Sequence, residues 1–104
     1  MVRKEFGELE GFIKRVKAKY RDSKIILFGS RARGEHLEDS DYDFIIISQK
    51  FTGIGFADRI EQIQSLWTRH ADVEPLCYTP EEFNEKKGEI GIVKEAARQG
   101  IVLA

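Results

Sequence analysis

The stretch KIILFGSRARGEHLEDSDYDFIIIS, residues 24–48, decides how this chain folds. Its first five residues form a short apolar run rich in strand formers, and the run ends abruptly at Gly29-Ser30. This pattern predicts a buried strand followed by a tight turn, with a short helical turn after Ser30. Residues 41–48 predict a second strand. Because its interior is continuously apolar, we expect both of its faces to be covered.

Helices and a third strand are expected on either side of this stretch. Apolar residues recur at helical spacing over residues 4–20 and again over 56–67, which predicts two amphipathic helices. Residues 71–77 are a candidate for the third strand. Within them, Pro75 favours an edge strand or a strand end, because proline donates no hydrogen bond to a neighbouring strand.

The end of the chain predicts two more helices. Thr79-Pro80-Glu81-Glu82 combines a capping residue, a proline suited to the first helical position and a glutamate that can complete a capping box. A short helix is therefore expected to about Lys87, followed by a last helix that Gly100 closes. Residues 101–103 are expected to trail off as an apolar tail. The predicted fold class is α+β, with a small mixed sheet of three or slightly more strands covered by helices.

Length and composition limit what kind of protein this is. A chain of 104 residues with 41% hydrophobic residues fits one domain, residues 1–104, and argues against disorder. No apolar run is long enough to predict a membrane span, and the first residues do not resemble a signal peptide. The one cysteine, Cys77, has no partner for an internal disulfide, which favours a reducing compartment and a cytoplasmic location.

The charges are divided unevenly along the chain. The net charge of −1 gives no overall case for nucleic acid as the main partner. Residues 1–34 carry ten Lys/Arg and four Asp/Glu, whereas residues 35–104 carry seven and fourteen. This asymmetry is compatible with an anion site beside a carboxylate site, and equally with two ordinary solvated helix surfaces.

Two carboxylates at the start of the second strand indicate a metal site. Asp41 and Asp43 are two residues apart on a strand, so their side chains point to the same face. Like charges placed so closely at the mouth of an apolar sheet need compensation. Carboxylate oxygens suit Mg²⁺, and an acidic strand entrance that simply faces water is the structural alternative.

The turn after the first strand suits a phosphate. Glycine at position 29 permits unusual backbone angles and a close approach, and the Ser30 hydroxyl and nearby backbone N–H groups can hold phosphate oxygens. Arg31 and Arg33 add positive charge beside them. A short connection can bring this turn next to Asp41 and Asp43, so that a triphosphate and carboxylate-held metal ions meet, as in-line nucleotidyl transfer requires.

Gly29-Ser30, ten residues, then Asp41-Tyr42-Asp43 resembles the signature of the DNA polymerase β-like nucleotidyltransferase superfamily. Within it, the chain looks like the minimal nucleotidyltransferases, single-domain proteins often paired with HEPN proteins in toxin–antitoxin modules. The similarity covers about residues 24–77. It implies an antitoxin role and a HEPN-type partner.

The resemblance also implies roles for individual residues. Gly29 and Ser30 would contact the triphosphate, with Arg31 and Arg33 assisting, and Asp41 and Asp43 would bind two Mg²⁺ ions. The family usually has a third carboxylate on the next core strand, which helps to bind the catalytic metal and orients the acceptor hydroxyl. Asp72 is the first candidate for it, and Glu74, two residues later on the same face, is the reserve.

The expected activity is therefore Mg²⁺-dependent transfer of a nucleoside monophosphate from an NTP, with ATP preferred, to a hydroxyl on a HEPN-type partner. One alternative is a binding protein that masks its partner without turnover. Another is transfer to a small molecule or to RNA. The chain is long enough for the nucleotide and metal half of such an enzyme, so a second polypeptide, or a second copy in a homodimer, is expected to complete the acceptor site.

His36, in the connection between the two motif halves, is expected to be an exposed loop residue.

Overall fold

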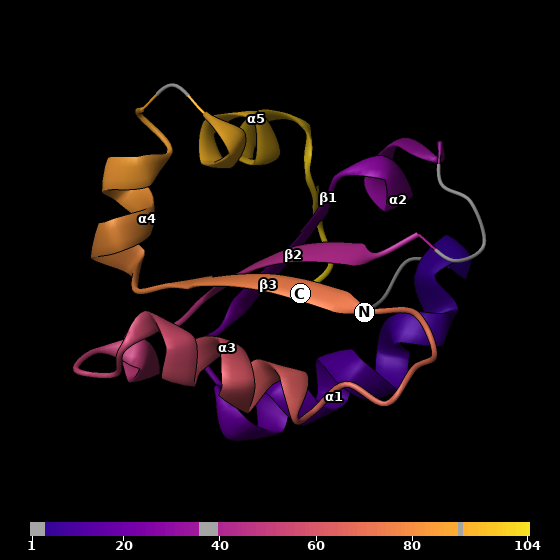
Figure 1. Cartoon of the computed structure of the whole chain (residues 1–104), viewed down its shortest axis with the longest axis horizontal. Helices are drawn as coiled ribbons and strands as arrows, with labels where there is room; N and C mark the ends of the chain where they lie inside the picture. The colour runs from indigo at the N-terminus through magenta and orange to yellow at the C-terminus, as the bar shows by residue number, and fades with distance from the viewer. Residues whose placement is uncertain (1–3, 36–39, 90) are drawn as a thin grey trace.

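A four-stranded mixed sheet organises the computed structural model, which describes residues 4–35, 40–89 and 91–104 (Figure 1). Its strands lie in the spatial order β3 (Val73–Tyr78), β2 (Tyr42–Ile47), β1 (Lys24–Phe28) and β4 (Ile101–Val102). β1 runs antiparallel to both β2 and β4, whereas β2 and β3 are parallel. The predicted α+β class with a small mixed sheet is confirmed.

Helices cover both faces of this sheet. They are η1 (Lys4–Leu9), α1 (Glu10–Lys19), α2 (Ser30–Arg33), η2 (Gln49–Phe51), α3 (Phe56–Gln64), α4 (Pro80–Lys86) and α5 (Ile92–Gln99). In Figure 1, α1 and α3 lie on one side of the sheet and α4 and α5 on the other. The capping box predicted at Thr79 and Glu82 is present, with Pro80 at the first position of α4.

Three element predictions need correction. The helix expected over 4–20 is divided, because residues 4–9 form a 3-10 helix with non-helical angles at Phe6, next to Gly7. The helix expected over 56–67 ends at Gln64, where the backbone tightens into turns and the Leu66 carbonyl accepts a hydrogen bond from Arg15 instead. Residues 101–102 are not a trailing tail but the strand β4.

The strand β4 forms because the free edge of β1 has backbone groups to satisfy. The N–H of Ile25 donates to the carbonyl of Ala104 at 3.1 Å, and the N–H of Leu103 donates to the carbonyl of Ile25 at 2.8 Å. The apolar side chain of Leu103 is buried against the main core. At the opposite edge of the sheet, β3 pairs with β2 alone, which confirms the edge position predicted from Pro75.

The alternation of side chains along β2 creates two different faces. Tyr42, Phe44 and Ile46 pack into the larger core under α1 and α3, where Phe44 lies 5.2 Å from Phe12 between ring centres. Ile45 and Ile47 pack into a smaller core with residues of α5 and α4. Asp43 precedes Ile45 on this second face, so the predicted site lies on the side of the sheet that carries α4 and α5.

Among the residues described, no helix is long and apolar enough to cross a bilayer.

Candidate functional site

The acidic and glycine motifs meet at one end of the sheet. The register pairs Phe28, the last residue of β1, with Asp43, the second residue of β2. On the other side of β2, Asp43 pairs with Glu74 of β3. Directly paired residues on neighbouring strands point to the same face, so Phe28, Asp43 and Glu74 share one face, and Gly29, the residue after Phe28, lies against the Asp43 carboxylate.

Asp43 lies in a surplus of negative charge. Its partial burial, a hydrogen bond with Glu74 and the charges of Glu74 and Asp41 together raise the pKa of Asp43 to about 6, and Arg33 opposes them only in part. Burial and nearby like charges both disfavour an ionised carboxyl group. A cation bound at this position would remove the repulsion, which is the charge balance expected of a metal site.

Gly29 fits the close approach between the turn and Asp43. It has φ 77° and ψ −161°, a region open essentially to glycine alone. A Cβ at this position would collide with Oδ2 of Asp43. The same residue precedes α2, and its carbonyl accepts hydrogen bonds from the N–H groups of Ala32 and Arg33 at 3.1 and 3.2 Å. The glycine therefore brings the start of α2, with Ser30, against the carboxylate.

The two predicted arginines have different surroundings. The Nε and Nη2 atoms of Arg31 donate to the carbonyl of Ser40 at 3.1 and 2.8 Å, and the guanidinium lies 4.1 Å from the ring centre of Tyr42. Arg31 thus fixes the residue before Asp41 against α2. Arg33 is exposed, pairs with Glu35 at 3.1 Å and adds positive charge near Asp43.

A cavity of about 180 Å³ adjoins Asp43 on the side of α2 and α5. Gly29, Ala32 and Arg33 form one wall, and Glu95 and Gln99 of α5 form another. The sequence analysis did not single out Glu95 or Gln99. Their spacing of four residues places them on one face of a helix, but only the packing of α5 against β1 shows that this face borders the site.

Asp72 and Glu74, the two candidates for the third carboxylate, are both exposed and lie differently. Asp72 precedes β3, and its backbone carbonyl accepts a hydrogen bond from the N–H of Tyr42 at 2.9 Å. Glu74 is the one that lies opposite Asp43. The register thus favours the reserve candidate. The choice between Asp72 and Glu74 as the third carboxylate stays a prediction.

Carboxylate oxygens are the ligands that Mg²⁺ prefers, so the chemistry of Asp41, Asp43 and Glu74 fits a hard cation. Among the residues that the structure describes, no three acidic, histidine or cysteine side chains are already grouped as a ligand set. Besides burial, a hydrogen bond with Glu74 and the charges of Glu74 and Asp41 raise the pKa of Asp43, so these neighbours disfavour its ionised form. Small rotations of these exposed or half-buried side chains, together with phosphate oxygens, would have to complete a metal's coordination.

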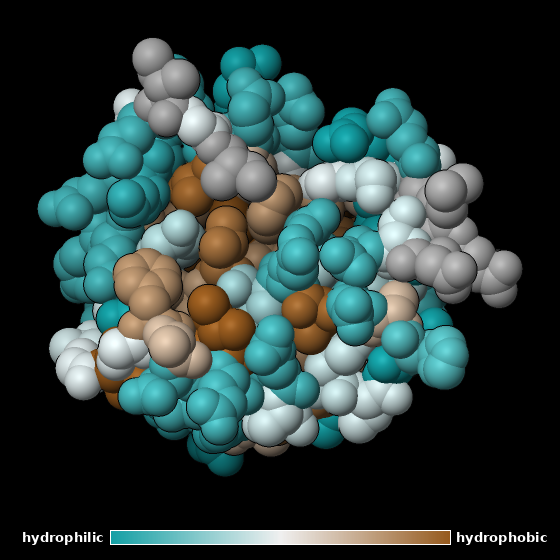
Figure 2. All heavy atoms as spheres, viewed as in Figure 1, coloured by the Kyte–Doolittle hydropathy of each residue, from teal (hydrophilic) through white to brown (hydrophobic). Residues whose placement is uncertain are grey.

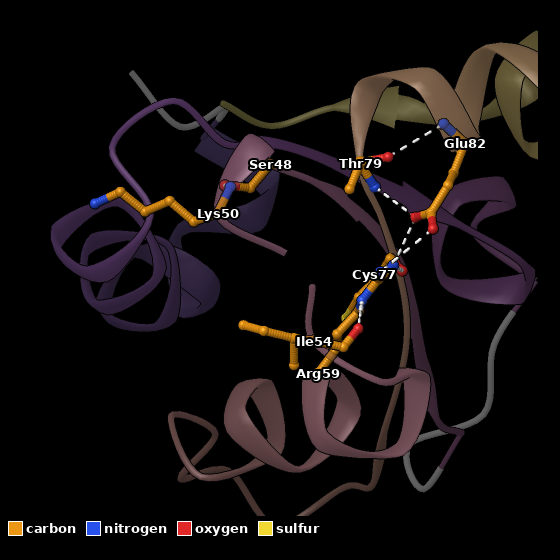
Figure 3. A network of polar contacts seen from close by, with 7 residues as sticks. All are labelled: Ser48, Lys50, Ile54, Arg59, Cys77, Thr79 and Glu82. Carbon is orange, nitrogen blue, oxygen red and sulfur yellow. Dashed lines mark hydrogen bonds and ion pairs between the residues drawn. The ribbon is translucent and has the colours of Figure 1, made fainter. Parts of the chain in front are cut away.

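A second polar cluster, which the sequence did not reveal, is structural (Figure 3). The buried Arg59 donates to the carbonyls of Ile54 and Cys77 at 2.7 and 3.1 Å and to the carboxylate of Glu82 at 2.6 Å. Glu82 also accepts from the N–H of Thr79 at 2.8 Å. The sequence offered one sign of this cluster, because Arg59 falls on the apolar face of α3.

The remaining titratable residues contribute little to the site. Burial raises the pKa of the Cys77 thiol to about 12, as fits a side chain packed in the larger core. His70 is exposed, and His36 lies outside the described residues.

The comparisons with known proteins agree with this geometry. The model of the nucleotidyltransferase domain matches residues 9–99. This chain belongs to the nucleotidyltransferase domain family. A protein of Methanocaldococcus jannaschii described as a "putative protein adenylyltransferase" is 32% identical over 97 residues, which cover 91% of this chain and 93% of the relative.

A solved structure supports the same fold. The crystal structure of a "putative nucleotidyltransferase" from Sulfolobus solfataricus superposes with a TM-score of 0.63 at 18% identity, over 91% of this chain and 76% of that one. Membership of the family makes the protein a nucleotidyl-transferring enzyme, and such enzymes generally use an NTP and Mg²⁺. The predicted reaction class is therefore confirmed.

Proposed function

We propose that this nucleotidyltransferase transfers AMP from ATP, with Mg²⁺, to a hydroxyl group of a partner protein. The observation that carries the proposal is the meeting of Gly29, Asp43 and Glu74 at one end of three adjacent strands. It combines a turn suited to phosphate with a pair of carboxylates whose repulsion calls for a cation.

Each residue has a defined part in the reaction. Gly29 leaves room for the triphosphate, Ser30 and Arg33 contact its oxygens, and Arg31 holds the segment that leads into Asp41. Asp41 and Asp43 would hold two Mg²⁺ ions. Bound there, the ions supply the positive charge that offsets the charge of the phosphates.

The group transfer is a single displacement. The acceptor oxygen forms a bond to the α-phosphorus, and the bond from that phosphorus to the oxygen bridging to the β-phosphate breaks, so that pyrophosphate leaves. The proton of the acceptor hydroxyl goes to a carboxylate. We assign this role to Glu74, because it lies opposite Asp43, and Asp72 is the alternative.

Two lines support AMP and a protein acceptor. The relative from M. jannaschii is named as a protein adenylyltransferase and matches over most of both chains. The resemblance to minimal nucleotidyltransferases suggests a HEPN-type toxin as the partner, with this chain as its antitoxin. Adenylylation of the partner would then be the neutralising step.

The test measures transfer of label from ATP carrying ³²P at the α-phosphate to a HEPN-type protein from the same genome, with and without Mg²⁺. We expect labelling to need Mg²⁺. Asp43→Asn should reduce it by more than about 100-fold, because even residues behind metal ligands contribute 10–100-fold to metal affinity. Glu74→Gln should have a similar effect, and Asp72→Asn a loss below about tenfold.

Glu61→Gln, an exposed substitution on α3, is the matched control and should leave the rate unchanged. If the partner stays unlabelled but is neutralised equally by wild type and Asp43→Asn, the protein acts by masking and the proposal is wrong. If Asp72→Asn is the more damaging of the two, the assignment of Glu74 is wrong.

A further inference from the structure

An in-line displacement constrains where the acceptor can enter. The attacking and leaving oxygens lie on opposite sides of the phosphorus that is transferred, so the acceptor hydroxyl must approach this phosphorus from the side opposite the departing pyrophosphate. In this chain Asp43, assigned to metal binding, and Glu74, assigned to the acceptor's proton, lie opposite each other on neighbouring strands. The inference below rests on the proposed function and concerns the side of this pair that the nucleotide leaves open.

The side next to Asp43 belongs to the nucleotide. The cavity there is bordered by Gly29 and Arg33, the residues suited to a triphosphate. It is narrow, at about 180 Å³, and α5 closes it on the far side. Gly100 holds α5 close to β1, because a Cβ at that position would collide with the Ala96 carbonyl and the Ile26 side chain.

A second, wider groove borders Glu74 on the other side. It has a volume of about 380 Å³ and lies along the start of β3, at the edge of the sheet. Its lining brings together one aromatic ring, one cation, one amide and two carboxylates: Trp67, Arg69, Gln64, Asp72 and Glu74. Both candidates for the proton-accepting carboxylate therefore face this groove.

The walls of the groove are held in place. The Trp67 Nε1 donates to the carbonyl of Ala71 at 2.7 Å, and its ring packs edge-on against Phe12 at 5.0 Å. The Arg69 Nη1 donates to the carbonyl of Glu8 at 3.2 Å, which ties the guanidinium to the segment before α1. An ordered aromatic wall and a tethered cation are features of a surface that binds a ligand without first rearranging.

We propose that this groove, lined by Gln64, Trp67, Arg69, Asp72 and Glu74, is the acceptor site. Its occupant is a segment of a protein that presents a hydroxyl group to Glu74 and Asp72 and an acidic side chain to Arg69. The ring of Trp67 suits an aromatic hydroxyl such as that of tyrosine, because aromatic rings pack favourably edge to face. Arginine pairs well with a carboxylate.

Two observations favour a protein over RNA as the occupant. The lining of the groove carries two carboxylates, Asp72 and Glu74, against one cation, Arg69, and its excess of negative charge would repel a phosphate backbone. Figure 2 shows apolar side chains gathered in the middle of the face that carries β3, with polar residues around them. Leu76, two residues after Glu74 on the same side of β3, is partly exposed.

The experiment separates acceptor binding from nucleotide binding. The probe is a fluorescein-labelled peptide with two glutamates beside a tyrosine, titrated by anisotropy in the presence of Mg²⁺ and a non-transferable ATP analogue. Binding of the analogue is measured separately. Arg69→Glu should weaken peptide binding at least tenfold and leave analogue binding unchanged. Arg21→Glu makes the same charge change at an exposed position near the opposite end of the sheet and should alter neither.

A second variant blocks the groove without changing its charge. Gln64→Cys, modified with a bulky maleimide, should abolish peptide binding, whereas Arg21→Cys modified in the same way should not. Cys77 is buried and should remain unmodified in both variants. Replacing the peptide's glutamates by lysines should weaken its binding, and replacing tyrosine by phenylalanine should abolish its labelling in the transfer assay.

The two binding measurements distinguish a failure of the acceptor site from a failure of the proposed function. If the analogue fails to bind, the proposed function itself fails. If the analogue binds but the peptide does not, or binds Arg69→Glu and blocked Gln64→Cys as well as wild type, the groove is not the acceptor site. An RNA oligonucleotide that binds in an Arg69-dependent manner in place of the peptide would overturn the assignment of a protein acceptor.

Discussion

Glu82 and Asp43 are two carboxylates in the same small fold, and the chain treats them in opposite ways. The guanidinium of Arg59 pairs with Glu82, which also accepts a hydrogen bond from the Thr79 N–H, and these contacts hold the pKa of Glu82 below its usual value (Figure 3). Asp43 lies beside Glu74 and Asp41, and its pKa rises to about 6. The first carboxylate is neutralised from within the chain.

The difference separates an acid whose charge is compensated inside the chain from one whose charge is not. Glu82 completes a network that joins α3, β3 and α4, so its charge is fully used inside the protein. Asp43 retains negative charge at a surface cavity, where it disfavours the folded state unless a ligand supplies positive charge. Three substitutions test this contrast through the free energy of unfolding.

The largest effect is expected from breaking the compensated pair. Glu82→Ala leaves the guanidinium of Arg59, which is 5% exposed, without its carboxylate and also removes the capping box of α4. Removing the carboxylate leaves the buried charge of Arg59 unpaired, so we expect a loss of about 3 kcal/mol in urea unfolding. Glu81→Ala, its exposed neighbour, should change stability by less than about 0.5 kcal/mol. Equal losses for the two variants would show that the pair is not structural.

The second-largest loss of stability is expected at Gly29, which leaves room for the Asp43 side chain. Gly29→Ala places a methyl group against Asp43 Oδ2 at a backbone conformation that costs about 1–3 kcal/mol for other residues, so we expect a loss of about 2 kcal/mol. Gly34→Ala is the control, since Gly34 also has a positive φ, of 73°, but has open space around it. It should cost only about 1 kcal/mol.

A double-mutant cycle sharpens this result. In an Asp43→Ala background the collision is gone, and part of the cost of Gly29→Ala should be recovered. Full additivity of the two substitutions would mean that the strain at Gly29 is independent of the carboxylate.

The smallest effect is a gain in stability. The pKa of folded Asp43, about 6, exceeds the unfolded value of 3.8, so the folded protein binds the extra proton and loses stability as the pH rises from about 4 to 6. Asp43→Asn should remove this loss. Solvent weakens the effect at this half-buried site, so we expect a gain of about 1 kcal/mol at pH 8 and none at pH 4.

Thermal unfolding at both pH values, with and without Mg²⁺, measures this gain. Mg²⁺ should stabilise the wild type at pH 8 more than it stabilises Asp43→Asn, because the cation offsets the repulsion that the substitution removes. Glu61→Gln should show no such pH dependence. A variant less stable than wild type at pH 8 would contradict the excess of negative charge at Asp43.

The sequence predicted the parts of the fold that depend on local patterns. The apolar runs of β1 and β2, the edge position indicated by Pro75 and the capping box at Thr79 were all found, because each follows from alternation, a missing N–H or side-chain capping within a few residues. The strand β4 was missed. A two-residue strand has too little pattern of its own and forms only because β1 offers an open edge.

For the candidate site, the sequence by itself determined which chemical groups lie close together along the chain. Gly29-Ser30 and Asp41-X-Asp43, with their spacing and strand contexts, indicated phosphate and metal binding. They also resemble the signature of the nucleotidyltransferases, the family to which the chain belongs. These features are local, since a turn needs glycine at one position and alternation places two acids on one face.

Tertiary structure alone decided which other residues lie beside the glycine turn and the two aspartates. The parallel register of β2 and β3 set Glu74 rather than Asp72 opposite Asp43, and a shift of one residue would have turned Glu74 to the other face. Packing of α5 brought Glu95 and Gln99 to the cavity beside Asp43, and the segment after α3 placed Trp67 and Arg69 in one groove with Glu74. Contacts between distant segments depend on how whole elements pack, and no local stretch of sequence specifies that.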